Sequence, residues 1–146
     1  ELRTIVSAIR VVFELARMGD LAAHVAKIAR LRFPDSAVPD SLRENFSRMS
    51  EVCLAMIRLA NQSLKDRDAV AALRMAEIDH EMDHLRRDHF GVLLGKNWSG
   101  SVEQAIDVAL LGRYFERFAD HAVAVARRVI YIITGQFPEG EEWPNA

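Results

Sequence analysis

One phrase of this sequence occurs twice, and the repetition limits what the chain can fold into. Residues 17–27 read RMGDLAAHVAK, and residues 117–127 read RFADHAVAVAR. Both copies follow the pattern Arg-x-x-Asp-x-Ala-x-x-Val-Ala and then a basic residue. An offset of 100 residues is too long for a solenoid unit and is typical of a duplicated helical bundle. Each copy puts charged and small apolar residues on different faces of one helix, so we expect function on the charged face.

Composition excludes several classes of protein. A chain of 146 residues favours one domain with a sizeable core, and 50% hydrophobic residues argue against disorder. The net charge of −2 gives no basic footprint for nucleic acid. The single cysteine, Cys53, excludes an internal disulfide and fits a reducing cytoplasm. The longest run without charge, residues 129–138, is too short for a membrane span, which needs about 20 apolar residues.

Helix-capping and helix-ending residues in the sequence predict an all-α protein with four long helices. We expect these helices at residues 2–31, 41–65, 68–95 and 101–134. Pro34 ends the first helix and Gly135 follows the last. The expected N-terminal caps are Ser41 with Glu44, Asp68, and Ser101 with Gln104. Short connections favour an antiparallel bundle of the last three helices, and no window has the alternation of a strand.

Apolar periodicity predicts how these helices pack. The expected buried stripe of the third helix is Ala71, Met75, Ile78, Met82, Leu85 and Val92. The stripe of the fourth helix is Leu111, Phe115, Phe118, Ala122, Val125, Val129 and Ile132, and further apolar residues on its other side include Ile106 and Val123. A helix that is apolar on nearly all sides is the central helix of its bundle.

The first helix has an apolar side that must also be covered. Its members are Ile5, Ile9, Val12, Leu15, Val25 and Ile28. We expect this side to pack on the fourth helix, on another copy of the chain, or on both, so that the chain forms a homo-oligomer.

Two pairs of carboxylates carry the chemistry of interest. Glu116 and Asp120 are four residues apart on one helix face, and Asp79 and Asp83 repeat that spacing on the third helix. One interpretation is a solvated face with weak Arg113–Glu116 and Arg117–Asp120 ion pairs. The other is a site for a hard cation such as iron, manganese, magnesium or calcium, built from two facing helices.

A zinc-hydrolase motif is also present in the third helix. Residues 80–84 read HEMDH, which matches His-Glu-x-x-His. Both histidines should face solvent, roughly opposite the buried stripe, whereas a catalytic zinc needs a third protein ligand and a sheltered cleft. We therefore expect His80 and His84 not to form a catalytic zinc site. No phosphate loop, nucleophile elbow or dinucleotide fingerprint occurs either, so we expect no enzyme activity.

The repeated phrase resembles the signature of the PhoU family of phosphate-signalling regulators. Residues 113–122 are the closer match and contain the family's Glu-x-x-x-Asp, whereas the first copy has Ala16 in place of that Glu. Residues 2–8 resemble the opening of the family's third helix, and residues 129–135 resemble its closing stretch.

The resemblance implies an up-down helical bundle that continues beyond this chain. Residues 1–33 would be the last helix of a first three-helix repeat, and residues 41–135 a complete second repeat. Residues 136–146 would be an acidic mobile tail. Because the sequence opens without Met inside a helical pattern, we interpret it as a fragment of an actinobacterial relative that lacks two upstream helices.

The resemblance also implies a function and a ligand set. Members of the family couple a phosphate ABC transporter to a sensor histidine kinase and hold the phosphate-starvation response off. Some bind iron or zinc through Glu/Asp-x-x-x-Asp motifs, which here would be Asp79, Asp83, Glu116 and Asp120. We expect a cytoplasmic adaptor without a catalytic site, whose partner-contact face is Arg113, Glu116, Arg117 and Asp120. The alternative from another class is a carboxylate-bridged metal-binding bundle with a storage or enzymatic role.

Overall fold

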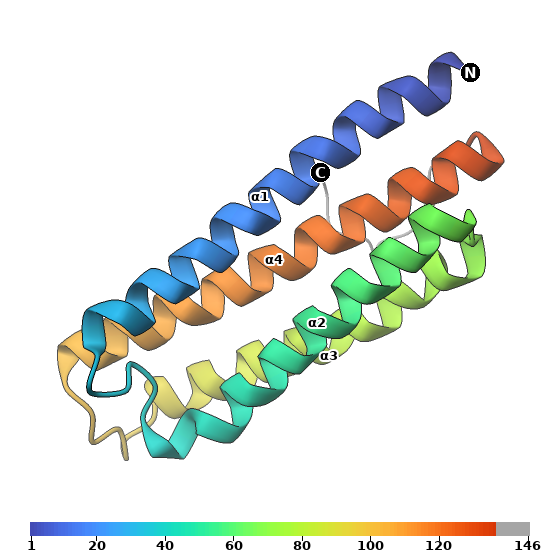
Figure 1. Cartoon of the computed structure of the whole chain (residues 1–146). Coiled ribbons are helices and arrows are strands. Elements are labelled where there is room, and N and C mark those ends of the chain that lie inside the picture. Colours follow the sequence, from blue (N-terminus) through green and yellow to red (C-terminus); the bar gives the residue numbers. More distant parts are fainter. Residues whose placement is uncertain (137–146) are drawn as a thin grey trace.

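The computed structural model describes residues 1–136 and is helical almost throughout. Its long helices are α1 (Leu2–Arg32), α2 (Arg43–Asp66), α3 (Ala69–Leu93) and α4 (Val102–Thr134), with a short 3₁₀ helix, η1 (Asp40–Leu42), before α2 (Figure 1). No strand occurs within residues 1–136, which confirms the all-α prediction. The expected acidic tail lies almost entirely outside the described residues.

Most of the predicted helix ends are correct, and one is wrong. The Asp68 carboxylate accepts the amides of Val70 and Ala71, and the Ser101 hydroxyl accepts the amide of Gln104. Gly135 ends α4 with a left-handed φ of 81°. Ser41, however, is not a cap: it lies inside η1, and the residue that precedes α2 is Leu42, with no side-chain cap. The chain enters α2 through a tighter helical turn, which brings Leu42 into the core.

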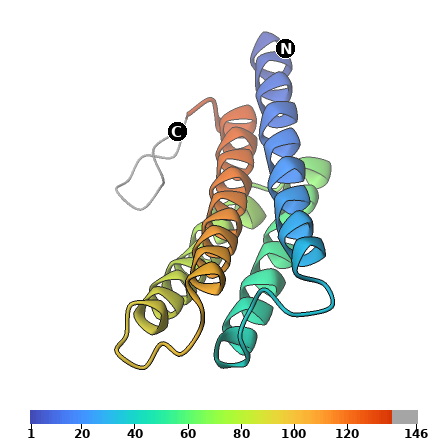
Figure 2. The ribbon, with the colours of Figure 1, turned by 90° about the vertical axis from the view of Figure 1, so that its left-hand side faces the viewer.

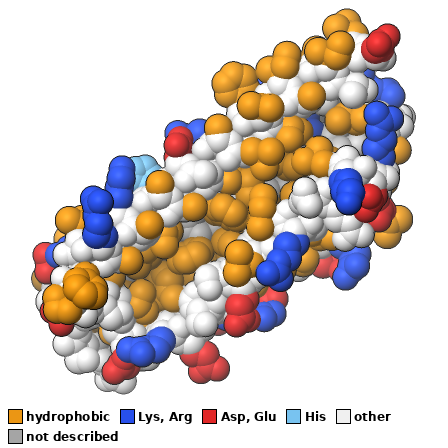
Figure 3. Space-filling view, in the orientation of Figure 1, with side chains coloured by type: hydrophobic (Ala, Val, Ile, Leu, Met, Phe, Trp, Pro, Cys, Tyr) orange, Lys and Arg blue, Asp and Glu red, His pale blue; other side chains and the backbone are white. Residues whose placement is uncertain are grey.

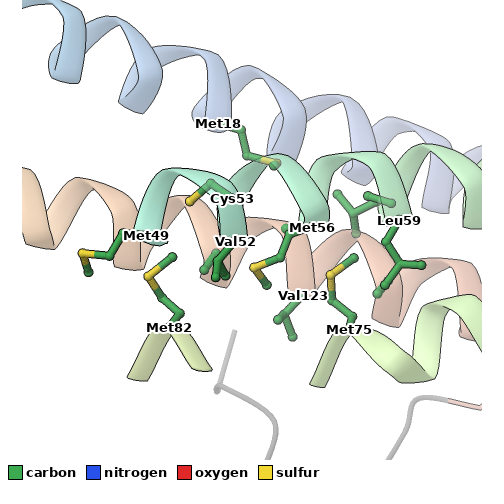
Figure 4. Packing of buried hydrophobic residues seen from close by; sticks show 14 of the residues in the cluster. Met18, Met49, Val52, Cys53, Met56, Leu59, Met75, Met82 and Val123 are labelled. Atoms are coloured by element: carbon green, nitrogen blue, oxygen red, sulfur yellow. The ribbon is translucent and has the colours of Figure 1, made fainter. Parts of the chain in front are cut away.

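Helices α2, α3 and α4 form the expected antiparallel bundle around a core rich in methionine. Met49, Met56 and Met75 are fully buried, and Val123 of α4 meets them from the facing helix (Figure 4). Methionine is flexible and polarisable, so it fills irregular gaps between helices well. One stripe prediction fails, because Val92 is 41% exposed in the last turn of α3. Ile106, expected on the other apolar side of α4, is 55% exposed where no helix covers it.

A tight contact joins α3 to α4 near one end of this bundle. The His89 ring is fully buried and lies against Phe46 and Phe90. It occupies the space beside Gly112, where a Cβ atom would lie 2.3 Å from the ring. The absence of a side chain at Gly112 therefore sets how closely α3 approaches α4.

Helix α1 packs along α4 in the antiparallel sense (Figures 1 and 2). At one end, the Arg32 guanidinium donates to both Asp107 oxygens and to Glu103, at 2.7 Å for the Glu103 contact. At the other end, Arg3 donates to the Ile132 carbonyl at 3.1 Å. Between these ends α1 buries Val11, Met18, Leu21 and Ile28. Packing of the first helix on the fourth is thus confirmed.

The other apolar side of α1 is not covered within residues 1–136. Ile5, Ile9 and Val12 are each more than half exposed, contrary to the burial expected of them, because α1 contacts little besides α4. Two adjoining hollows of about 500 and 340 Å³ separate α1 from α2, and both are lined by Val25 and Phe115. Figure 3 shows hydrophobic side chains along this hollow.

We expect Gly112→Ala to lower the free energy of unfolding by about 1–3 kcal/mol, because the buried His89 ring cannot easily move away from a new methyl group. Gly19→Ala is the matched control, since nothing lies within 4 Å of a Cβ at that helical position. It should stabilise the chain by about 0.5–1 kcal/mol. Urea unfolding followed by circular dichroism measures both changes. A Gly112→Ala variant as stable as the wild type would contradict this account of the α3–α4 contact.

Candidate functional site

The two copies of the repeated phrase lie on neighbouring antiparallel helices and overlap only near their first residues. One copy is in the middle of α1 and the other in the middle of α4, and the two helices run in opposite directions. The Glu14 carboxylate meets the His121 ring nitrogen Nδ1 at 2.6 Å, and the His24 ring stacks on Tyr114 at a centroid distance of 5.2 Å. Each copy therefore contacts the residues just ahead of the other copy across the α1–α4 seam.

The four predicted carboxylates converge between α3 and α4. Burial raises the pKa of Asp79 to about 6, and the negative charges of Asp83, Asp120 and Glu116 add to this rise. Burial also raises the pKa of Asp120, with further repulsion from Glu116. The residues that sequence spacing placed on two facing helices are thus neighbours in the fold. They form a partly buried acidic cluster.

Two arginines neutralise this cluster in part. The Glu116 side chain is only 14% exposed and meets Arg86 of α3 at 3.2 Å and Arg113 at 2.6 Å. The Arg113–Glu116 pair was expected, but Arg86 was not singled out by the sequence reasoning. A signal for it exists, since Arg86 follows Asp79 and Asp83 at spacings of seven and three and so shares their helix face.

The expected Arg117–Asp120 pair does not form among the described residues. Asp120 is half-buried towards α3, while Arg117 remains exposed, so the two side chains leave α4 in different directions. In the first copy the equivalent pair does form, with Arg17 and Asp20 at 3.4 Å in solvent. The face predicted for partner contact is therefore divided: Arg113 and Arg117 face solvent, whereas Glu116 and Asp120 face α3.

The remaining candidates of the sequence are the two histidines of α3. His80 and His84 are exposed, as expected for the side of α3 opposite its buried stripe. Within residues 1–136, no three side chains of His, Cys, Asp or Glu are close enough together to hold a metal ion as they stand. None of the helices in that range is long and apolar enough to cross a membrane.

The raised pKa of Asp79 predicts how stability depends on pH. Its pKa in the fold lies above the ordinary value of 3.8, so ionisation of Asp79 costs stability as pH rises from about 4 to above about 6. We expect Asp79→Asn to remove this cost and to stabilise the chain by about 1 kcal/mol at slightly alkaline pH, with allowance for its partial exposure.

Thermal unfolding at a series of pH values measures this effect. The advantage of Asp79→Asn over the wild type should vanish below about pH 3, where the wild-type carboxyl is neutral in both states. Asp88→Asn, an exposed change on the same helix, is the control and should show no such dependence. Parallel curves for the wild type and Asp79→Asn would contradict the repulsion inferred at this cluster.

Comparison with known proteins identifies relatives along the whole chain. A family model described as PhoU domain matches residues 46–129. Phosphate-specific transport system accessory protein PhoU homolog 1 of Mycobacterium leprae is 45% identical over 146 residues, 100% of this chain and 66% of that protein. PhoU homolog 2 of Mycobacterium tuberculosis strain H37Rv is 47% identical over 138 residues, 94% of this chain and 65% of that protein.

The similarity extends to more distant bacteria. The PhoU homolog of Rhizobium meliloti is 27% identical over 143 residues, 97% of this chain and 60% of that protein. The chain thus spans slightly less than two thirds of the length of these curated relatives. Because the family model covers more than half of the sequence, the chain belongs to the PhoU domain family.

Proposed function

We propose that this chain is part of a cytoplasmic accessory protein that regulates phosphate transport. The observation that carries the proposal is 45% identity, over the full 146 residues, to a protein named as a phosphate-specific transport system accessory protein. The arrangement of the helices supports the same role. Long antiparallel helices with exposed charged and apolar faces suit an adaptor, whose work is to bind partners.

We further propose that the accessory protein is a negative regulator without enzymatic activity. It would couple a phosphate ABC transporter, through its ATPase subunit, to a sensor histidine kinase and hold phosphate-starvation signalling off when phosphate is plentiful. An adaptor of this kind needs two accessible surfaces and a scaffold that keeps their relative orientation. The exposed apolar side of α1, with Ile5, Ile9 and Val12, also supports homo-oligomer formation, in which a second copy covers that side.

The contact face of this adaptor is proposed to centre on the exposed arginines of α4. Arg113 and Arg117 point to solvent, while Glu116 and Asp120 face α3 and serve to position the helix pair. Arg117 has no ion-pair partner among the described residues, so its charge is available to a partner.

A second candidate role is cation binding at the acidic cluster. The pKa of Asp79, raised first by burial and further by nearby carboxylates, supports it, because a cation would relieve the repulsion among Asp79, Asp83, Glu116 and Asp120. As they stand, however, the Glu116 oxygens are occupied by Arg86 and Arg113. A cation would have to displace these arginines. The carboxylate oxygens are suitable ligands for a hard ion, but their present positions do not form a site for one.

For the adaptor role, we expect Arg117→Glu in the longer protein to weaken binding to the kinase or to the transporter ATPase. Phosphate-starvation genes would then be expressed in rich phosphate. Stability should change by less than about 0.5 kcal/mol, because the side chain is exposed. Arg58→Glu, an exposed change on α2 with the same difference in charge, should leave binding and repression intact. A folded Arg117→Glu protein that binds both partners and represses normally would show that the face is wrongly assigned.

For cation binding, the double change Glu116→Ala with Asp120→Ala should remove bound Mn²⁺ or Mg²⁺ in calorimetric titration and leave the helix content unchanged. Arg86→Gln with Arg113→Gln should act in the opposite direction and tighten binding, because it frees the Glu116 oxygens. Metal binding that is undiminished in the first variant would refute this assignment of ligands.

A further inference from the structure

The outer side of α3 carries an exposed seam that the fold does not use. Helix α3 lies at the edge of the bundle, where it packs on α2 and α4 (Figure 2). Met75 and Met82 are fully buried, and the residues on the opposite side are exposed: Leu73, Glu77, His80, His84, Arg87 and Gly91. The steps between these residues alternate between four and three, which is the spacing of a coiled-coil seam. We call this set the outer seam of α3.

The outer seam is complementary to itself in the reverse direction. Its positions are symmetric about the level of Met82, so in an antiparallel pair of copies each position meets its mirror position. Glu77 then meets Arg87 of the second copy. Neither side chain has an ion-pair partner within residues 1–136, so both charges are available. On one flank, the exposed Arg74 lies near Asp88 of the second copy. Such self-complementarity is what a two-fold dimer requires.

The centre of the outer seam is the His-Glu-x-x-His motif. His80 and His84 are exposed and four residues apart, so both rings project from the same face of α3. In the antiparallel pair, His80 of each copy meets His84 of the other, and four imidazoles surround the two-fold axis. Zinc prefers four ligands in a tetrahedron, and imidazole suits it. One chain alone supplies only two of them, in line with the absence of a metal-binding group of three within residues 1–136.

We propose that Zn²⁺ joins two copies of this chain through the outer seam of α3, with His80 and His84 of both copies as its ligands. The protein fills all four positions around the metal, so the site is structural and has no open position for catalysis. The Glu77–Arg87 pairs between the copies set the antiparallel direction. Exposed ion pairs contribute little on their own, so this dimer forms only with the metal bound.

The surroundings of the two histidines suit a cation. Glu81 and Asp83 flank them and lie near their own counterparts in the second copy, where the zinc charge offsets the repulsion between like charges. In the single chain, Nη2 of Arg87 lies 3.4 Å from Nδ1 of His84. When Arg87 turns to Glu77 of the second copy, this ring is released for the metal. Formation of the ion pairs and binding of zinc therefore support each other.

Sedimentation velocity with the 146-residue chain tests the proposal. We expect Zn²⁺ to double the mass of the zinc-free species, with one zinc for every two chains, and EDTA to reverse the change. Mg²⁺ should have no such effect, because it prefers oxygen ligands. His80→Gln with His84→Gln should abolish the response to zinc. His24→Gln, a change at an exposed histidine of α1, should respond like the wild type.

Reversal of charge tests the direction of the pairing. Glu77→Arg should weaken the zinc-dependent dimer by about tenfold, because it places arginines opposite each other. Glu77→Arg combined with Arg87→Glu should restore it. Chains with Leu73→Cys should form disulfides with Gly91→Cys chains in preference to chains of their own kind. Gly91 accepts this change, since nothing lies within 4 Å of a Cβ at that position.

A zinc response that survives the loss of both histidines would overturn the proposal, as would a charge swap that restores nothing or cross-links mainly between like chains. So would loss of the response in Glu116→Ala with Asp120→Ala, because the metal would then lie in the acidic cluster. Association through the apolar side of α1 needs no zinc, so EDTA separates it from this contact. None of these measurements involves the kinase or the ATPase, so their outcome leaves the adaptor role untouched.

Discussion

The whole structure depends on the packing of α4, which contacts α1, α2 and α3 at once. A helix can take three neighbours only if its sides are apolar and its contact residues are small enough for close approach. Helix α4 meets this condition with Ala119, Ala122 and Ala126, which are fully buried, and with Gly112 beneath the His89 ring. The charged residues of α4 are therefore confined to the narrow strips between its neighbours.

That confinement explains the electrostatics of the acidic cluster. Glu116 and Asp120 lie where α4 borders α3, and the sequence of α3 places two more carboxylates opposite them. Without compensation such a cluster would oppose folding, since partly buried carboxylates that repel one another resist joint ionisation. Arg86 of α3 provides this compensation through its ion pair with Glu116. The repulsion that remains adds to the effect of burial and raises the pKa of Asp79 to about 6. The Arg86–Glu116 pair therefore links α3 to α4 beside their apolar core.

Sequence reasoning found the elements of this fold and the convergence of its carboxylates, because both follow from spacing along a helix. It failed where the outcome depends on which neighbour covers a given side. Val92 continues an apolar stripe and Ile106 belongs to the other apolar side of α4, but both lie where no helix reaches them. Arg117 and Asp120 have ideal spacing for a pair, yet Asp120 is half-buried beside α3 while Arg117 is exposed. The Glu14–His121 contact joins residues 107 positions apart, and only the register of α1 on α4 determines it.

The repeat separates two kinds of exposed apolar residue. Gly19 and Ala119 occupy equivalent positions of the repeat, and so do Val12 and Gly112. Only the two residues of α4 are buried, because α2 and α3 cover that side of α4. Nothing within residues 1–136 covers the same side of α1. Exposure of Val12 thus reflects the lack of a covering helix within residues 1–136. Ile106 and Leu110 are different, since they stay exposed on a helix whose own bundle is already complete. Their exposure therefore differs in origin from that of Val12, since α2 and α3 already occupy the covered sides of α4.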